Sequence, residues 1–172
     1  MAERTRREEL FRRVVAEYGS GLWRLTAGYA RTHADREDLY QEVLLAVWGA
    51  LPEFRDESSL RTYVFRIGHN RGISYRRRQT RRPLAVSLEG LTSSEPSPES
   101  EAMAGSLRAE LLEAIRALPH GRRQVLMLHL EGLAPREIGE VLGITPNHVS
   151  VRLHRARADL RRRLDLNFET RG

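Results

Sequence analysis

Residues 135–149 have the sequence PREIGEVLGITPNHV, in which two glycines stand four positions apart. A helix-turn-helix needs a small residue where its two helices cross, and Gly139 supplies one. The turn needs a residue that tolerates a positive φ, and Gly143 does so because glycine has no Cβ. Ile144 and Val149 follow as apolar anchors. This spacing favours a helix-turn-helix over a helical hairpin that serves only packing.

The second helix of this motif has Thr145 as a cap and Pro146 at its first position. In DNA-binding helix-turn-helix proteins, the outward residues of the second helix face the major groove. A groove-binding helix needs mostly polar or basic side chains at these positions. The candidate DNA-binding residues are Asn147, His148, Ser150, Val151, Arg152, His154 and Arg155.

Apolar residues recur at helical spacing on both sides of this motif, and no segment alternates as a strand does. The fold class is therefore predicted to be all-α, with two small helical domains joined by a flexible linker. The linker is residues 83–106, where Pro, Ser, Thr and Glu replace large apolar residues. Both domains are near the lower size limit for a self-sufficient core, so we expect them to lean on each other or on a partner.

The N-terminal part has several turn and cap signals that predict helix boundaries. We expect one helix to end near residues 19–21 and a second to run from Leu22 to Arg31. A third helix has Asp35 as its cap and ends at Pro52, and Ser58 or Ser59 caps a fourth.

Charge is segregated along the 172-residue chain, whose formal net charge is +6. All 29 basic residues are Arg. Residues 61–82 hold eight Arg and no acid, whereas residues 83–106 hold four Glu and no Arg. Two basic blocks separated by an acidic one indicate two contacts with a polyanion. The chain has no Cys, which excludes disulfides, zinc fingers and thiol catalysis.

Two further patterns stand in the N-terminal part. Tyr63, Phe65 and Tyr75 are interleaved with arginines, a pairing that suits unpaired nucleic acid, although a solvated basic helix with a core tyrosine would give the same pattern. Asp38, Gln41, Glu42 and Leu45 recur three or four apart and share one helix face. This mixed face fits a protein interface, and equally the solvated side of an amphipathic helix.

In combination, these motifs resemble those of bacterial RNA polymerase sigma factors, most closely the small extracytoplasmic-function group. The resemblance covers about residues 10–82 and 107–165. The motifs that carry it are residues 38–43 (DLYQEV), residues 61–70 (RTYVFRIGHN), Leu118-Pro119 and the helix-turn-helix. It implies a domain for core polymerase and the −10 promoter element over residues 1–82, an acidic linker over 83–106, and a −35-binding domain over 107–172.

Carried over by position, the resemblance assigns roles to single residues. Asp38, Gln41, Glu42 and Leu45 would grip the helices of the polymerase's largest subunit. Arg66, Asn70, Arg71, Ser74 and Arg77 would meet −10 DNA. Residues 54–60 would form the loop that holds a flipped base, and the outward residues of the last helix would contact the −35 element. The family often has Trp at position 63, an aromatic residue near Leu60, an acid at Ser74 and a basic residue at Ser150.

These expectations describe a promoter-specificity subunit that is not an enzyme, works in the cytoplasm and needs no metal or cofactor. Its partners would be core RNA polymerase, promoter DNA and a sequestering anti-sigma factor, with no membrane insertion, since no apolar run approaches the length of a bilayer span. The alternative is a stand-alone helix-turn-helix regulator that acts without polymerase.

Overall fold

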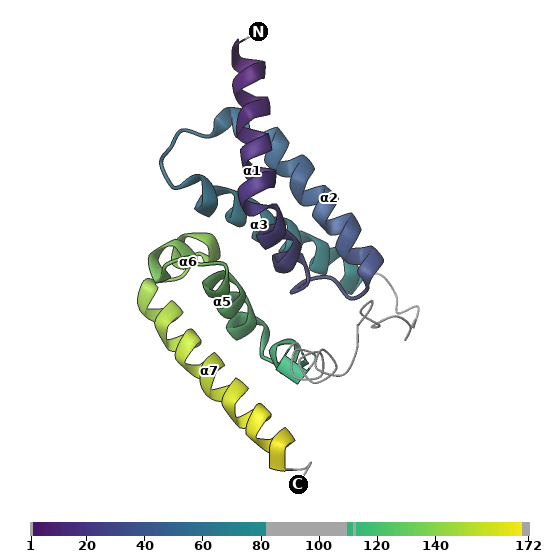
Figure 1. Ribbon diagram of the computed structural model, residues 1–172, viewed down its shortest axis with the longest axis vertical. Helices are drawn as coiled ribbons and strands as arrows, with labels where there is room; N and C mark the ends of the chain where they lie inside the picture. The colour runs from purple at the N-terminus through teal and green to yellow at the C-terminus, as the bar shows by residue number, and fades with distance from the viewer. Residues whose placement is uncertain (1, 82–109, 112, 170–172) are drawn as a thin grey trace, which may run out of the picture.

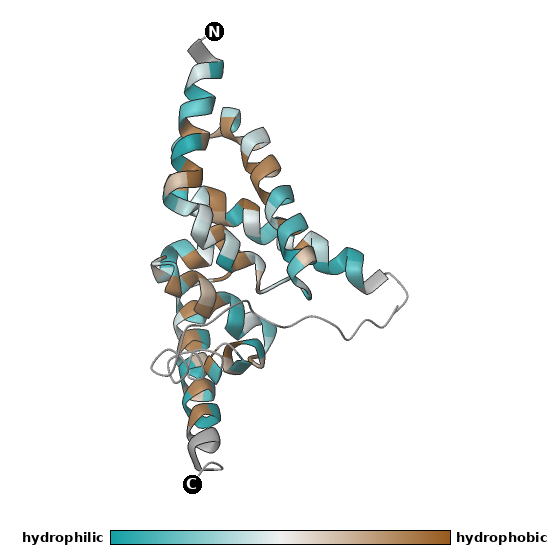
Figure 2. Cartoon of the chain, turned by 45° about the vertical axis from the view of Figure 1, so that its right-hand side comes forward, coloured by the Kyte–Doolittle hydropathy of each residue, from teal (hydrophilic) through white to brown (hydrophobic). Residues whose placement is uncertain are grey.

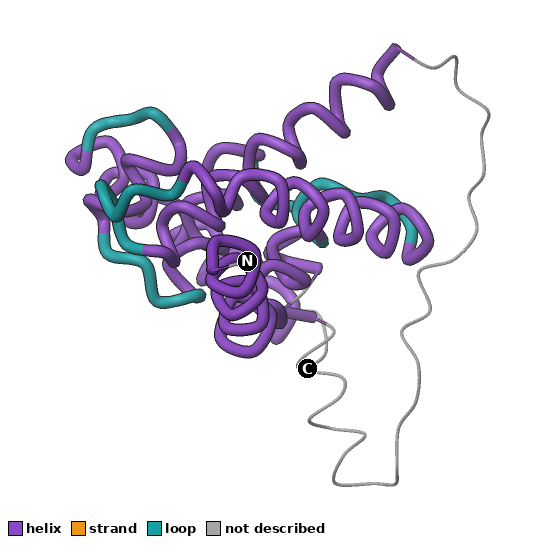
Figure 3. The backbone as a smooth tube through the Cα atoms, turned by 90° about the horizontal axis from the view of Figure 1, so that it is seen from above, coloured by secondary structure: helices purple, strands orange, loops and turns teal. Residues whose placement is uncertain are grey.

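The computed structural model describes residues 2–81, 110–111 and 113–169. These residues form helices joined by short loops, and no strand occurs among them (Figure 3). The predicted all-α fold class is confirmed. The predicted linker, residues 83–106, lies outside the described residues.

The N-terminal half, residues 2–81, is a bundle of three long helices. Its apolar faces meet in the interior, where Val14, Leu39 and Val64 have no exposed surface. Burial of such side chains contributes about 1.5–3 kcal/mol each and holds the helices together. The elements are α1 (Ala2–Thr26), α2 (His33–Ala50), the short 3-10 helix η1 (Leu51–Glu53) and α3 (Leu60–Arg81).

The prediction of two helices before Arg31 is wrong, because α1 continues through Gly19 and Gly21 to Thr26. Both glycines lie where another part of the molecule approaches the helix. A Cβ on Gly21 would stand 2.9 Å from the Phe65 ring, and one on Gly19 would stand 3.1 Å from the Tyr40 hydroxyl. Glycine is used here for close helix contact rather than for a turn.

Local caps set the other helix starts in this half. Thr32, and not the expected Asp35, is the N-cap of α2; the two residues form a capping box. Ser59 caps α3, as predicted, because its hydroxyl accepts a hydrogen bond from the Thr62 amide at 3.0 Å. Pro52 stands in η1 directly after α2 ends, which confirms it as the stop signal.

The C-terminal half, residues 110–169, contains the predicted helix-turn-helix. Its elements are a short helical segment at residues 113–116, then α5 (His120–Leu130), α6 (Pro135–Leu142) and α7 (Pro146–Glu169). Gly143 has a φ of +67°, and the Thr145 hydroxyl accepts from the His148 amide at 3.3 Å. The turn and cap predictions are thus confirmed.

The two halves lie directly against each other (Figure 1). Helix α6 rests on α3, α5 touches α1, and the buried apolar side chains of both halves form one continuous cluster. Figure 2 shows apolar and polar residues alternating along the helices of both halves. The expectation that the halves lean on each other is therefore confirmed.

Polar contacts reinforce this junction. The Glu137 carboxylate at the start of α6 accepts hydrogen bonds from Thr62, Ser59 and Arg61 at the start of α3. Farther along, the Arg24 guanidinium donates two hydrogen bonds to Glu131, at 2.6 and 2.7 Å. The Glu137 bonds fix α6 on α3, and the Arg24 bonds fix the end of α5 on α1.

Gly139 provides a test of the helix crossing. A Cβ there would lie 2.6 Å from the backbone oxygen of Ile144, so Gly139→Ala should lower the free energy of unfolding by about 1–3 kcal/mol. The matched control is Gly49→Ala in α2, where nothing lies within 4 Å of the new Cβ and helix propensity should add about 0.5–1 kcal/mol. Urea denaturation of both variants checks this, and equal effects would contradict the crossing.

Candidate functional site

The outward face of α2 is set by its buried face. Leu39, Val43 and Val47 have no exposed surface and recur every four residues, which turns the intervening positions outward. Leu45 is 71% exposed, unusually high for a leucine. The polymerase-facing set predicted from the sequence does share this outward side: Asp38, Gln41, Glu42 and Leu45.

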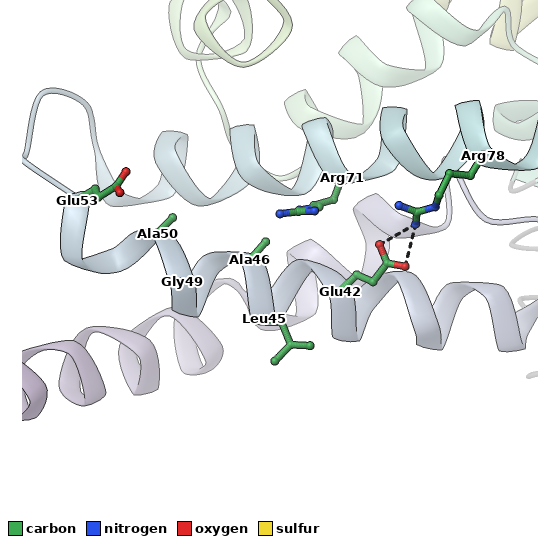
Figure 4. Close-up of a pocket in the computed structure, with 8 residues that line it drawn as sticks. All are labelled: Glu42, Leu45, Ala46, Gly49, Ala50, Glu53, Arg71 and Arg78. Carbon is green, nitrogen blue, oxygen red and sulfur yellow. Dashed lines mark hydrogen bonds and ion pairs between the residues drawn. The ribbon is translucent and has the colours of Figure 1, made fainter.

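Glu42 links this face to α3. Its two carboxylate oxygens each accept a hydrogen bond from the Arg78 guanidinium at 2.8 Å. Figure 4 shows this pair at one end of a groove between α2 and α3, with Arg71 pointing into the same groove and Leu45 on its rim. The α2 face and the basic face of α3 are therefore neighbours.

The outward face of α3 contains the residues assigned to −10 DNA. Asn70, Arg71, Ser74 and Arg77 are exposed, while Arg66 is half-buried with its guanidinium 5.7 Å from the centre of the Tyr63 ring. The Ser74 hydroxyl donates to the Asn70 carbonyl at 2.9 Å. Its hydrogen is thus used within the helix, and only the lone pairs of the oxygen are left to face a ligand.

Two of the three aromatic residues expected to stack on bases belong to the core instead. Phe65 is 1% exposed and Tyr75 is 6% exposed, and burial raises the pKa of Tyr75 to about 12. Both lie on the buried side of α3, because their positions fall on the helix stripe that contacts the rest of the bundle. Tyr63 is half-buried, and its hydroxyl donates to the Ala50 carbonyl at 3.0 Å.

A cavity opens beside the loop before α3. The Phe54 and Tyr63 rings lie 5.0 Å apart at its wall, tilted by 48°. Asp56 in the loop has a φ of +58°, a strained conformation for a non-glycine residue. The residues lining the cavity are Glu53, Phe54, Arg55, Glu57, Ser58, Tyr63 and Arg66.

The outward face of α7 matches most of the groove-binding set. Ile138, Val149 and Ala156 are fully buried and hold α7 against α6. The exposed residues are Asn147, His148, Ser150, Val151, His154 and Arg155.

Two residues of that set differ from a simple outward side chain. Arg152 is half-buried, with its guanidinium beside Gly121 of α5. Ser150 donates its hydroxyl hydrogen to the Pro146 carbonyl at 3.1 Å. The structure therefore separates Arg152 from the other outward residues of α7.

Several polar residues at the junction of the halves were not singled out from the sequence. They include Tyr29 and Gln124, whose side chains meet although 95 positions separate them. Arg78 was also missed as the partner of Glu42. The sequence offered one signal for His69. This histidine stands four positions after Phe65 and therefore on the same buried side of α3.

Comparisons with known proteins match this architecture. The model of sigma-70 region 2 matches residues 14–82, and that of sigma-70 region 4 matches residues 108–160. The RNA polymerase sigma factor CnrH of Cupriavidus metallidurans is 31% identical over 172 residues, covering 94% of this chain and 90% of that protein. This chain belongs to the sigma-70 family. It falls in the extracytoplasmic-function group, like the sigma-E factor of Escherichia coli, which is 26% identical and matches 87% of this chain and 84% of its own length.

Solved structures agree with the sigma factor fold. A structure of CnrH in complex with the cytosolic domain of CnrY has a TM-score of 0.68 at 26% identity, covering 96% of this chain and 99% of that one. The sigma factor RpoE of Bartonella quintana, solved with the anti-sigma factor NepR, has a TM-score of 0.72 at 20% identity and covers 90% and 96%. The second likeness concerns the fold alone.

The function follows from the family. This sigma factor directs RNA polymerase to begin transcription at promoters, and the alternative of a regulator that works without polymerase is not favoured. Sigma factors are generally non-enzymatic subunits that recognise DNA. None of the described helices combines the length and apolar character that a bilayer crossing needs.

The exposed position of Glu42 gives a stability test. Because the pair with Arg78 is exposed by 40% on the Glu42 side, Glu42→Gln should change the free energy of unfolding by less than about 1 kcal/mol. Val43→Ala, one position away but fully buried, should cost about 2 kcal/mol. Chemical denaturation measures both, and an equal loss in the two variants would make Glu42 a structural residue rather than part of a free face.

Proposed function

We propose a division of labour within this sigma factor. Residues 1–82 bind core polymerase and the −10 element, residues 107–172 bind the −35 element, and the acidic residues 83–106 connect them. Polymerase is contacted by Asp38, Gln41, Glu42 and Leu45. The −10 element is contacted by Arg66, Asn70, Arg71, Ser74 and Arg77.

The observation that carries this proposal is the shared groove of α2 and α3. Glu42 on the proposed polymerase face and Arg71 on the proposed DNA face line the same groove, together with Arg78 at its end (Figure 4). A compact domain can therefore hold a protein on one helix and DNA on the next. The exposed Leu45 adds the apolar contact that protein interfaces need at their centre.

The −10 element would be held as an unpaired strand. The loop cavity has the Phe54 and Tyr63 rings packed together on its wall, and Arg66, which also lines it, supplies a positive charge for the backbone. Stacking on aromatic rings contributes about 1–3 kcal/mol per base. Tyr63 keeps the stacking role that the sequence suggested for it, and Phe54 takes the role suggested for Phe65 and Tyr75.

The −35 element would be contacted as duplex DNA in the major groove. The contact set is Asn147, His148, Ser150, Val151, His154 and Arg155, with Arg152 supporting α7 from its place beside α5. Ser150 contributes little to base choice in this scheme, because its hydroxyl hydrogen is held by the helix backbone.

An anti-sigma factor is a further proposed partner. CnrH was solved in complex with the cytosolic domain of CnrY, and the Bartonella protein with the anti-sigma factor NepR. The exposed polymerase and DNA faces of this chain are surfaces that such a partner would cover. We place the protein in the cytoplasm, with its polymerase, and assign it no catalysis of its own.

The polymerase face can be tested by charge reversal. Asp38→Arg with Glu42→Arg should weaken binding to purified core polymerase at least about tenfold, since like charges would then oppose the partner surface. Glu9→Arg with Glu17→Arg makes the same charge change on exposed positions of α1 and should bind normally. Pull-down and fluorescence titration supply the affinities. Unchanged binding of the first variant would refute the proposed interface.

The −35 face can be tested with two single substitutions. Arg155→Ala should weaken binding to a −35 duplex across sequences and reduce the salt dependence by about one phosphate contact. Ser150→Ala should leave the affinity within about threefold, because only a bond within the helix is lost. Anisotropy titrations at several salt concentrations measure both, and a large loss for Ser150→Ala alone would reverse the assignment.

A further inference from the structure

A polar cluster, buried at Tyr29 and His69 and half-buried elsewhere, joins the two halves at the centre of the molecule. The N-terminal half contributes Tyr29, His69 and Arg76, and the C-terminal half contributes His120 and Gln124. The Tyr29 hydroxyl lies 2.6 Å from Nδ1 of His69, and the Gln124 amide donates to the same hydroxyl at 3.1 Å. The Arg76 guanidinium lies 2.5 Å from Nδ1 of His120.

The geometry requires an unprotonated Nδ1 on His120 and favours one on His69. The guanidinium of Arg76 can only donate, so Nδ1 of His120 must accept and cannot bear a proton. A Tyr29 hydroxyl that accepts from Gln124 still has its hydrogen to donate to Nδ1 of His69, and the Gln124 amide nitrogen lies 3.5 Å from the same ring nitrogen. A proton on Nδ1 of His120 therefore replaces an attractive contact with a repulsive one, and a proton on Nδ1 of His69 requires the Tyr29 hydroxyl to turn its own hydrogen away.

The surroundings oppose protonation as well. Burial lowers the pKa of His69 to about 4, and His69 is 5% exposed. Burial also lowers the pKa of His120 to about 4, with added repulsion from Arg76, Arg123 and His69. Burial raises the pKa of Tyr29 to about 12, so this hydroxyl stays protonated.

The position of Tyr29 is fixed by the fold. Its ring lies flat against Gly72 of α3, where a Cβ would stand 2.5 Å from the ring atoms. The His120 ring meets it edge-on, with the ring centres 5.9 Å apart. Because the Tyr29 ring is held between α3 and α5, its hydroxyl cannot move with His69 if the His69 side chain changes its rotamer.

The Glu137 carboxylate, which also bonds across the junction, responds differently to acid. Hydrogen bonds from Ala134, Thr62 and Ser59, together with Arg61, hold the pKa of Glu137 below its usual 4.5, despite the opposing effect of burial. Glu137 therefore stays mostly charged between pH 6.5 and 5. In this window His69 and His120 are neutral in the closed form and become protonated only when the contact opens.

We propose that this cluster is a proton-sensitive latch: neutral His69 and His120 hold the two halves together, and their protonation releases the C-terminal half from the N-terminal half. Opening the latch changes the spacing of the α3 and α7 faces, which the closed arrangement fixes. The proposal requires neither polymerase nor DNA, so it can fail while the proposed function stands.

The direction follows from linkage. A histidine with a pKa near 4 in the closed form and 6.5 in the open form stabilises the closed form fully above pH 6.5. This stabilisation is lost as the pH falls from 6.5 toward 4, because the open form then binds more protons. At pH 5 the closed-to-open ratio falls about 30-fold for each histidine that is freed.

The test is fluorescence energy transfer in the full-length chain. The protein lacks cysteine, so Glu37→Cys and Arg161→Cys, both at exposed positions, give one dye site on each half. We expect the transfer efficiency to change between pH 6.5 and 5 while the helical circular dichroism signal stays constant. A pH-independent efficiency, or a simultaneous loss of helix, would overturn the latch.

Two matched variants assign the effect. His69→Asn with His120→Asn keeps an acceptor oxygen near each Nδ1 but cannot be protonated, so its efficiency should not change with acid. His33→Asn alters an exposed histidine on α2 and should respond like the parent protein.

A second measurement covers the case in which the double variant folds poorly. In the parent protein, the NMR signals of two of the six histidines should stay neutral until the energy transfer changes. Titration of all six near pH 6.5 with no change in transfer contradicts the proposal.

Discussion

Helix α3 packs against α1, α2 and α6 at the same time, and the rest of the molecule is arranged around that constraint. One side packs on α1 and α2, another on α6, and the third remains open to solvent. The approach on the first side is close enough that a Cβ on Gly68 would stand 3.1 Å from Leu25. Arg61 and Arg76 are used at the junction, and the exposed polar and basic residues of α3 lie on the open side, which is the proposed DNA face.

The arginines divide into structural and outward groups. Arg24 and Arg61 cross the junction to carboxylates, and Arg78 joins α3 to Glu42 on α2. Arg155 on α7 and Arg71 on α3 point outward instead. A sigma factor needs the outward arginines to bind phosphates. The structural arginines help to hold the helices that position them.

The contact between the halves gives the protein a defined starting arrangement. A continuous apolar cluster and several partly buried hydrogen bonds hold α6 on α3, while both proposed DNA faces stay exposed. The arrangement therefore does not cover the recognition residues; it sets the relation between them. Any signal that weakens the junction acts on that relation.

The sequence determined the features that depend on neighbours in the chain. The helix-turn-helix, its left-handed Gly143, the Thr145 and Ser59 caps and the all-α class all follow from local spacing, because backbone geometry within a few residues decides them. The outward residues of α2 and α7 follow from the same periodicity, apart from Arg152.

Tertiary structure decided what depends on residues far apart in the chain. The missing Cβ allows a turn at Gly143 and a close helix contact at Gly21. The sequence around Gly21 does not reveal which use applies, because the contact is with Phe65, far away in the chain. In the sequence Phe65 and Tyr75 resemble base-stacking residues, but in the folded bundle both are buried in the core. The pairing of Tyr29 with Gln124 could not be seen from periodicity, because it exists only where two halves of the chain meet.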